Sequence, residues 1–142
     1  RMFDVILVSH GSFARAVLES AELICGDQER VKTYGLHLGE SVDVFRDMVR
    51  GGIAESLTRG EVLVLSDIQS GSPFNVTCAA MGDMAFHHVT GMNLPMVIEA
   101  LVDRVDLPIG EVVSNALALG ASSMADVNAL VNLDSEVEDD DE

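Results

Sequence analysis

Two segments of the chain carry residues that can do chemistry at the point where an apolar run ends. In VILVSHGSFA the run from Val5 to Val8 stops at Ser9 and His10, and in LVLSDIQSGSPFN the run stops before Asp67. A short apolar run followed by a helix-like pattern is typical of a buried strand in an α/β sheet. Such folds keep their ligands at the carboxyl edge of the strands, so His10 and Asp67 are candidate catalytic residues.

The two residues are expected to work as a pair. The first and third strands of this kind of sheet are commonly adjacent, which would bring the Asp67 carboxylate within reach of the His10 ring. A carboxylate bonded to one imidazole nitrogen fixes the tautomer and leaves the other nitrogen free to attack. If the ring carries a phosphoryl group on Nε2, as the resemblance described below implies, Asp67 should hold Nδ1, because a carboxylate beside Nε2 would repel that group. The pattern therefore predicts a nucleophilic histidine.

The segment after Asp67 predicts a phosphoryl-binding loop. Ser72 is a suitable N-cap and Pro73 a suitable first helical residue. Free backbone N–H groups at such a helix start, with the Ser72 hydroxyl, can bind the oxygens of a phosphoryl group or another oxyanion. We predict that Gly11, Gly71 and Ser72 bind the phosphoryl group, and that Ser72 joins His10 and Asp67 in catalysis. Phosphoryl transfer depends mainly on positioning and charge stabilisation, so such a site would need no metal and no cofactor.

Strand and helix patterns alternate along the chain. They predict an α/β fold with a doubly wound, mainly parallel central sheet and helices on both faces. The periodicity of the region from Ala121 to Leu133 does not decide between a strand and a continued helix; a resemblance to a known family, described below, implies that it could be an exchanged antiparallel edge strand. The predicted strands are 5–8, 31–38, 62–66 and 87–91, and the predicted helices are 13–25, 42–57, 74–86, 94–104 and 109–119.

Composition sets the broad class of the protein. The 142 residues, 48% of them hydrophobic, are enough for one domain, which we place at 2–133. The formal net charge of −16 includes seven acids in 134–142, a predicted disordered tail, and it argues against nucleic acid as a partner. No apolar run is long enough to span a bilayer and no signal-peptide layout is present, so we expect a cytoplasmic protein.

The chain resembles the mannose-type enzyme IIA domains of the bacterial phosphoenolpyruvate-dependent sugar phosphotransferase system. The resemblance covers Met2 to Leu119 and rests on VILVSHGSFA, LSDIQSGSPFN and TGMNLPMVIEAL in that order. It implies that His10 accepts a phosphoryl group from the histidine-containing phosphocarrier protein and passes it to a IIB component, while Asp67 holds the ring and Ser72 contacts the phosphoryl oxygens. It also implies a homodimer that associates peripherally with a membrane transporter through the IIC and IID components.

Several alternatives are weighed against this interpretation. The nearest are a phosphotransferase subunit that feeds a dihydroxyacetone kinase and a regulatory domain controlled by phosphorylation of His10. Three other classes fit less well because of the residues that follow the first strand, Ser9 and His10. A receiver domain needs an acidic pair at this place, and a flavin-binding module needs a hydroxyl-rich loop. A histidine phosphatase needs an arginine next to the histidine. For His37, which the sequence leaves isolated, and for the neighbouring His87 and His88, we predict structural or solvated roles.

Overall fold

The computed structural model describes residues 2–132, so the predicted acidic tail at 134–142 lies outside them. These residues form a four-stranded sheet in the order β2-β1-β3-β4. Its parallel pairing and the adjacency of β1 and β3 were predicted. The strands are β1 (Asp4–His10), β2 (Val31–Leu36), β3 (Val62–Ser66) and β4 (His87–Val89). The helices are α1 (Phe13–Cys25), α2 (Val42–Leu57), α3 (Gly71–Ala80), α4 (Leu94–Asp103) and α5 (Ile109–Ser122).

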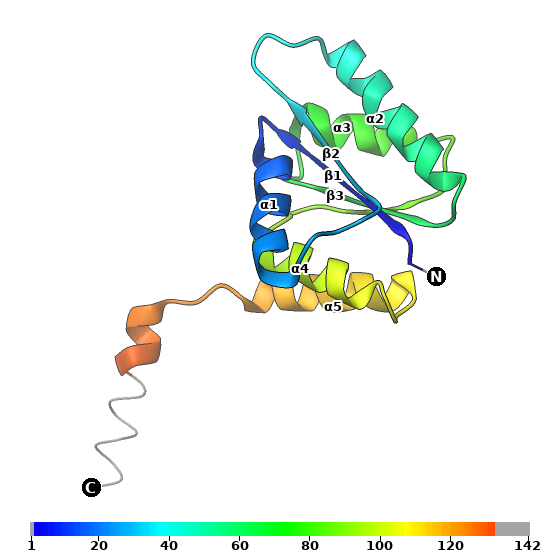
Figure 1. The fold of residues 1–142 in the computed structure, drawn as a ribbon. Helices are drawn as coiled ribbons and strands as arrows, with labels where there is room; N and C mark the ends of the chain where they lie inside the picture. The colour runs from blue at the N-terminus through cyan, green and yellow to red at the C-terminus, as the bar shows by residue number, and fades with distance from the viewer. Residues whose placement is uncertain (1, 133–142) are drawn as a thin grey trace, which may run out of the picture.

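The sheet is covered on both faces, which explains why its central strands are apolar throughout. In β1, Val5 and Leu7 face the layer of α1, α4 and α5, whereas Ile6 and Val8 face α2 and α3. These four side chains are completely buried. Figure 1 shows the sheet between these two helical layers. A strand buried on both sides reads as a continuous apolar run rather than an alternating one.

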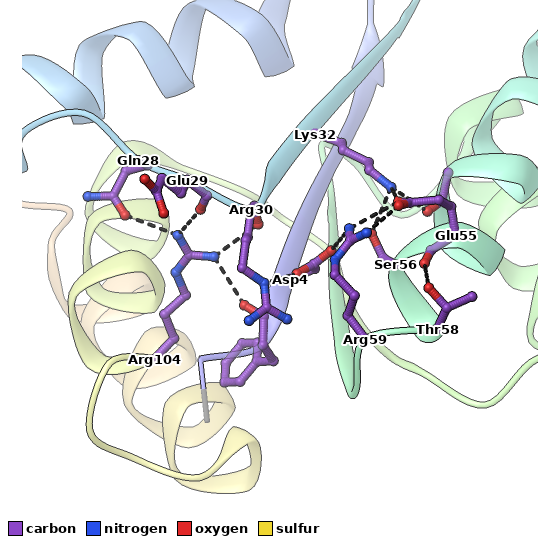
Figure 2. A network of polar contacts seen from close by, with 12 residues as sticks. Asp4, Gln28, Glu29, Arg30, Lys32, Glu55, Ser56, Thr58, Arg59 and Arg104 are labelled. Atoms are coloured by element: carbon purple, nitrogen blue, oxygen red, sulfur yellow. Dashed lines mark hydrogen bonds and ion pairs between the residues drawn. The ribbon is translucent and has the colours of Figure 1, made fainter.

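A buried arginine connects segments at the edge of the sheet where the strands begin. Arg104 at the end of α4 is 1% exposed, and its guanidinium donates to the carbonyls of Phe3, Glu29 and Arg30 and to the Gln28 side chain. Figure 2 shows these bonds reaching from α4 to the start of β1 and the turn before β2. Charged donors form strong hydrogen bonds in a buried setting, so this contact fixes the entry into both strands.

One predicted helix differs from the structure. The sequence predicts a third helix at 74–86 with Ser72 as its N-cap, but α3 begins at Gly71, has Ser70 as its N-cap and ends at Ala80. Gly71 has a positive φ of 84°, which glycine adopts readily, and the chain turns into the helix at this residue, ahead of Ser72 and Pro73. After α5 the chain is exposed and helical again at residues 127–132, and it forms no edge strand within the described residues.

Candidate functional site

His10 and Asp67 meet at the carboxyl edge of the sheet because β1 and β3 are parallel neighbours. Val8 pairs with Ser66, so the residues after each lie at the same edge. The His10 Nδ1 lies 2.8 Å from Asp67 Oδ2, and the His10 backbone amide donates to the same oxygen over 2.8 Å. The Ile68 amide donates to the other oxygen over 2.9 Å. The carboxylate therefore holds both the ring and the main chain of the histidine.

This arrangement keeps Asp67 ionised. Partial burial raises the pKa of the Asp67 carboxyl, but the hydrogen bonds from the His10 amide and ring and from the Ile68 amide lower it by more. The net pKa lies below its usual value. An ionised carboxylate at Nδ1 favours the tautomer with the proton on that nitrogen, which leaves the lone pair on Nε2. The His10 side chain is 47% exposed, so another protein can reach the ring.

The free ring nitrogen faces the start of α3. A Cβ placed on Gly71 would lie 2.7 Å from His10 Nε2 and 2.9 Å from Cε1. The N-cap residue, Ser70, makes no side-chain capping bond, and the first amides of a helix have no acceptor within it. The helix start therefore offers backbone donors and the positive end of a helix dipole beside His10 Nε2.

The predicted phosphoryl-binding residues have different environments. Gly71 contacts the ring, and Gly11 follows His10 with its amide donating to the Leu36 carbonyl over 2.8 Å. Ser72 is the second residue of α3 and is half-buried, but it is not the N-cap. Its hydroxyl makes no hydrogen bond within residues 2–132. The structure thus brings His10, Asp67 and Gly71 together, and Ser72 directly follows Gly71 in the chain.

These features can be compared with known proteins. A family described as "PTS system fructose IIA component" matches residues 4–117, which is most of the chain. The chain belongs to this EIIA family. The resemblance stated from the sequence motifs is therefore confirmed at the level of the family.

Relatives and solved structures agree with this assignment. The EIIA chain is 31% identical over 127 residues to the mannose-specific EIIAB component of Escherichia coli K12, covering 88% of the chain and 39% of that relative. It therefore spans about two fifths of the length of that curated relative. It is 28% identical to the fructose-specific EIIA component of Bacillus subtilis over 123 residues, covering 86% of the chain and 84% of the relative.

Among solved structures, the EIIA chain is similar to the phosphotransferase system component EIIA from Streptococcus agalactiae, with a TM-score of 0.82 and 29% identity. That match covers 90% of this chain and 99% of the other. It is also similar to the PTS IIA protein associated with the fucose utilization operon of Streptococcus pneumoniae, with a TM-score of 0.79, 31% identity and coverage of 91% and 97%. The fold is therefore shared over almost the whole length of both neighbours.

Two residues that support the His10 loop of the EIIA chain were not predicted. Ser9 is fully buried, and its hydroxyl accepts a hydrogen bond of 2.8 Å from the Ala14 amide. Gly35 in β2 leaves room for the loop, since a Cβ there would lie only 2.0 Å from the Gly11 carbonyl oxygen. Ser9 could have been found as the polar residue that ends the buried apolar run. The Gly35 contact depends on the packing of β2 against the loop and leaves no local sequence signal.

The other histidines differ from one another. His88 is half-buried, with Nε2 2.8 Å from Ser66 Oγ, and burial lowers the pKa of its ring. His87 is exposed on the neighbouring position of β4. His37 is not isolated as the sequence suggested, because its ring lies 2.7 Å from Glu40 Oε1. The loop between Leu36 and Ser41 folds back on itself, which brings a carboxylate three residues away onto the ring.

The described residues contain no group of three or more histidine, cysteine or acidic side chains arranged to hold a metal ion. Within the same residues, no helix is both long and apolar enough to cross a membrane.

Proposed function

We propose that His10 carries a phosphoryl group that it receives from the histidine-containing phosphocarrier protein and passes to a IIB component during sugar uptake. The observation that carries this proposal is the orientation of the His10 ring, held at Nδ1 by Asp67 with Nε2 facing the start of α3. Membership in the EIIA family supports the same role.

The transfer follows from this geometry. The Nε2 lone pair attacks the phosphorus of the donor's phosphohistidine, the donor N–P bond breaks, and its electron pair returns to the donor nitrogen. The Nδ1 proton stays on the ring beside Asp67, whose negative charge offsets the positive charge that develops on the phosphorylated imidazole. Because phosphoryl transfer depends mainly on positioning and charge stabilisation, a ring fixed by one carboxylate suits the reaction.

The phosphoryl oxygens would be bound by the groups around Nε2. We assign this role to the amides of Gly71 and Ser72 and to the Ser72 hydroxyl. The Gly11 amide, which was predicted to share it, instead donates to the Leu36 carbonyl. A helix start contributes roughly 0.3–1 kcal/mol per charge at an exposed site, so these hydrogen bonds supply most of the stabilisation. Any side chain at position 71 would crowd Nε2, because a Cβ there would lie 2.7 Å from it.

The proposed cellular setting follows from the same role. A carrier that meets both the phosphocarrier protein and a IIB component would work in the cytoplasm and reach the membrane only through the IIC and IID components.

We place this role in a single IIA domain at 2–133 that acts as a homodimer. Size-exclusion chromatography with light scattering tests the dimer, and a monomeric mass at working concentration would contradict it.

The function is tested by following a labelled phosphoryl group through purified components. The chain is mixed with the phosphocarrier protein, its charging enzyme and labelled phosphoenolpyruvate, and a IIB component is then added. We expect stoichiometric label on the chain that moves to IIB. Label that stays on the chain after IIB is added would favour the regulatory alternative, and a chain that takes no label would refute the carrier role.

A further inference from the structure

A second histidine at the same edge of the sheet is held in the same way as His10. One oxygen of Glu40 lies 2.7 Å from His37 Nδ1 and also accepts the His37 backbone amide over 2.7 Å. In the first pair, one oxygen of Asp67 accepts the ring and the amide of His10 at 2.8 Å each. In both pairs the carboxylate favours a proton on Nδ1 and leaves the Nε2 lone pair free.

His37 is also placed where a partner of His10 would reach it. It directly follows Leu36, which pairs with His10 across β1 and β2. Both histidines line one surface hollow of about 470 Å³, together with Gly11 and the loop that ends at Glu40. The His37 side chain is 57% exposed, somewhat more than that of His10. A protein that docks over His10 therefore covers His37 as well.

The other side of His37 offers groups that bind phosphoryl oxygens. A second hollow of about 240 Å³ is lined by His37, Ser12, Arg15 and Thr33, with Gly11 and Gly35 between them. Arg15 is exposed, and its guanidinium forms no ion pair within residues 2–132. A guanidinium binds phosphate oxygens through two parallel hydrogen bonds, and hydroxyl groups can donate to the remaining oxygen. The hollow thus pairs an accessible imidazole with a free cation.

We propose that His37 is a second phosphoryl acceptor, charged directly by the same phosphohistidine protein that charges His10. This inference rests on the proposed function, because it needs the same donor. The His37 Nε2 lone pair attacks the donor's phosphorus, the donor N–P bond breaks with its electron pair returning to the donor nitrogen, and the Nδ1 proton stays beside Glu40. The phosphoryl group passes from the donor to His37 without first being carried by His10, because His10 Nε2 faces Gly71 in α3 rather than the loop that carries His37.

Peptide mapping separates the two sites cleanly. Trypsin cuts after Arg15, Lys32 and Arg46, so His10 lies in peptide 2–15 and His37 in peptide 33–46, each as the only histidine. The full chain is charged with the phosphorylated phosphocarrier protein and digested at alkaline pH, which preserves phosphohistidine. We expect phosphate on both peptides. Phosphate on peptide 2–15 alone would overturn this inference and leave the proposed function intact, and phosphate on neither would overturn both.

Variants test the direct route. In His10→Gln we expect phosphate to remain on peptide 33–46, and in the double variant with His37→Gln we expect its complete loss. Loss of phosphate from peptide 33–46 in His10→Gln, with circular dichroism unchanged, would overturn direct charging. Phosphate that persists in the double variant would place the label elsewhere and would also overturn the assignment.

A matched pair of carboxylate variants tests the role of Glu40. Glu40→Gln should slow charging of His37 by about tenfold or more while charging of His10 is unchanged, because the ring loses a charge-assisted hydrogen bond. Glu19 is an exposed carboxylate on α1, and Glu19→Gln should leave both peptides charged at the normal rate. Equal charging of His37 in the two variants would contradict the proposed arrangement.

Discussion

Replacing Gly71 with alanine tests the geometry around His10 with the smallest possible change. The new Cβ would lie 2.7 Å from His10 Nε2 and 2.9 Å from Cε1, closer than carbon atoms approach other heavy atoms without bonding. Either the ring or the start of α3 must move. Since the ring is held by Asp67 over 2.8 Å, a shift of the ring lengthens that hydrogen bond and turns Nε2 away from the helix start.

Two separate costs are expected for Gly71→Ala. The positive φ of 84° disfavours any residue with a Cβ and lowers the free energy of unfolding by about 1–2 kcal/mol. The displaced ring lowers the transfer rate, and a misplacement of about 1 Å in a reacting group can cost about a hundredfold. The assay is single-turnover transfer from the labelled phosphocarrier protein in a rapid-quench instrument, together with urea denaturation of each variant.

Gly26→Ala is the matched control. Gly26 has a φ of 86°, lies just after α1 and would place its Cβ in open space. It should lose about the same stability as Gly71→Ala, about 1–2 kcal/mol, and transfer phosphate at the normal rate. If the two variants transferred phosphate equally fast, the contact between Gly71 and the His10 ring would have no role in the reaction and our reasoning would be refuted.

Four further predictions concern the site and its support. Asp67→Asn should slow charging of His10 about thirtyfold, the equivalent of about 2 kcal/mol for one charge-assisted hydrogen bond, and a normal single-turnover rate would count against the pair. Ser72→Ala should slow transfer about fivefold, or about 1 kcal/mol, and an unchanged rate and phosphohistidine lifetime would remove Ser72 from the site. Burial lowers the pKa of His88, so the unfolded chain takes up a proton first and the free energy of unfolding should fall as the pH drops below about 6.5. In urea titrations at several pH values, His88→Gln should flatten the pH dependence of the free energy of unfolding, while His87→Gln leaves it unchanged. The same pH dependence in both variants would show that His88 is not its cause. Arg104→Met should lower the free energy of unfolding by about 3 kcal/mol, because the carbonyls of Phe3, Glu29 and Arg30 each lose a charged donor, and a loss below about 1 kcal/mol would contradict that value.

The pairing of His10 with Asp67 could be predicted although 57 positions separate the two residues. The apolar runs before each residue marked two buried strands, and the residues that come directly after two parallel neighbouring strands lie at one edge of the sheet. The choice of Nδ1 followed from the repulsion expected between a carboxylate and a phosphoryl group. These arguments need only the order of the strands, which strand periodicity and the α/β connection rules restrict strongly.

The start of α3 could not be predicted in the same way. Ser72 followed by Pro73 fits the usual preferences for an N-cap and a first helical residue, and those preferences are local. The helix instead begins at Gly71, whose positive φ lets the chain pass close to the His10 ring. That constraint comes from the neighbouring strand and not from the sequence of the loop. The carboxylate on His37 was missed for a related reason, because it depends on how an irregular loop folds back.

The most direct test of the central claim is the position of the phosphate after reaction with the phosphocarrier protein. The charged chain is digested at alkaline pH, and the phosphorylated atom of peptide 2–15 is identified by mass spectrometry and by ³¹P–¹H correlation spectra. We predict phosphate on Nε2 of His10. Phosphate on Nδ1, or a His10→Gln variant that still delivers phosphate to a IIB component at the normal rate, would contradict the account.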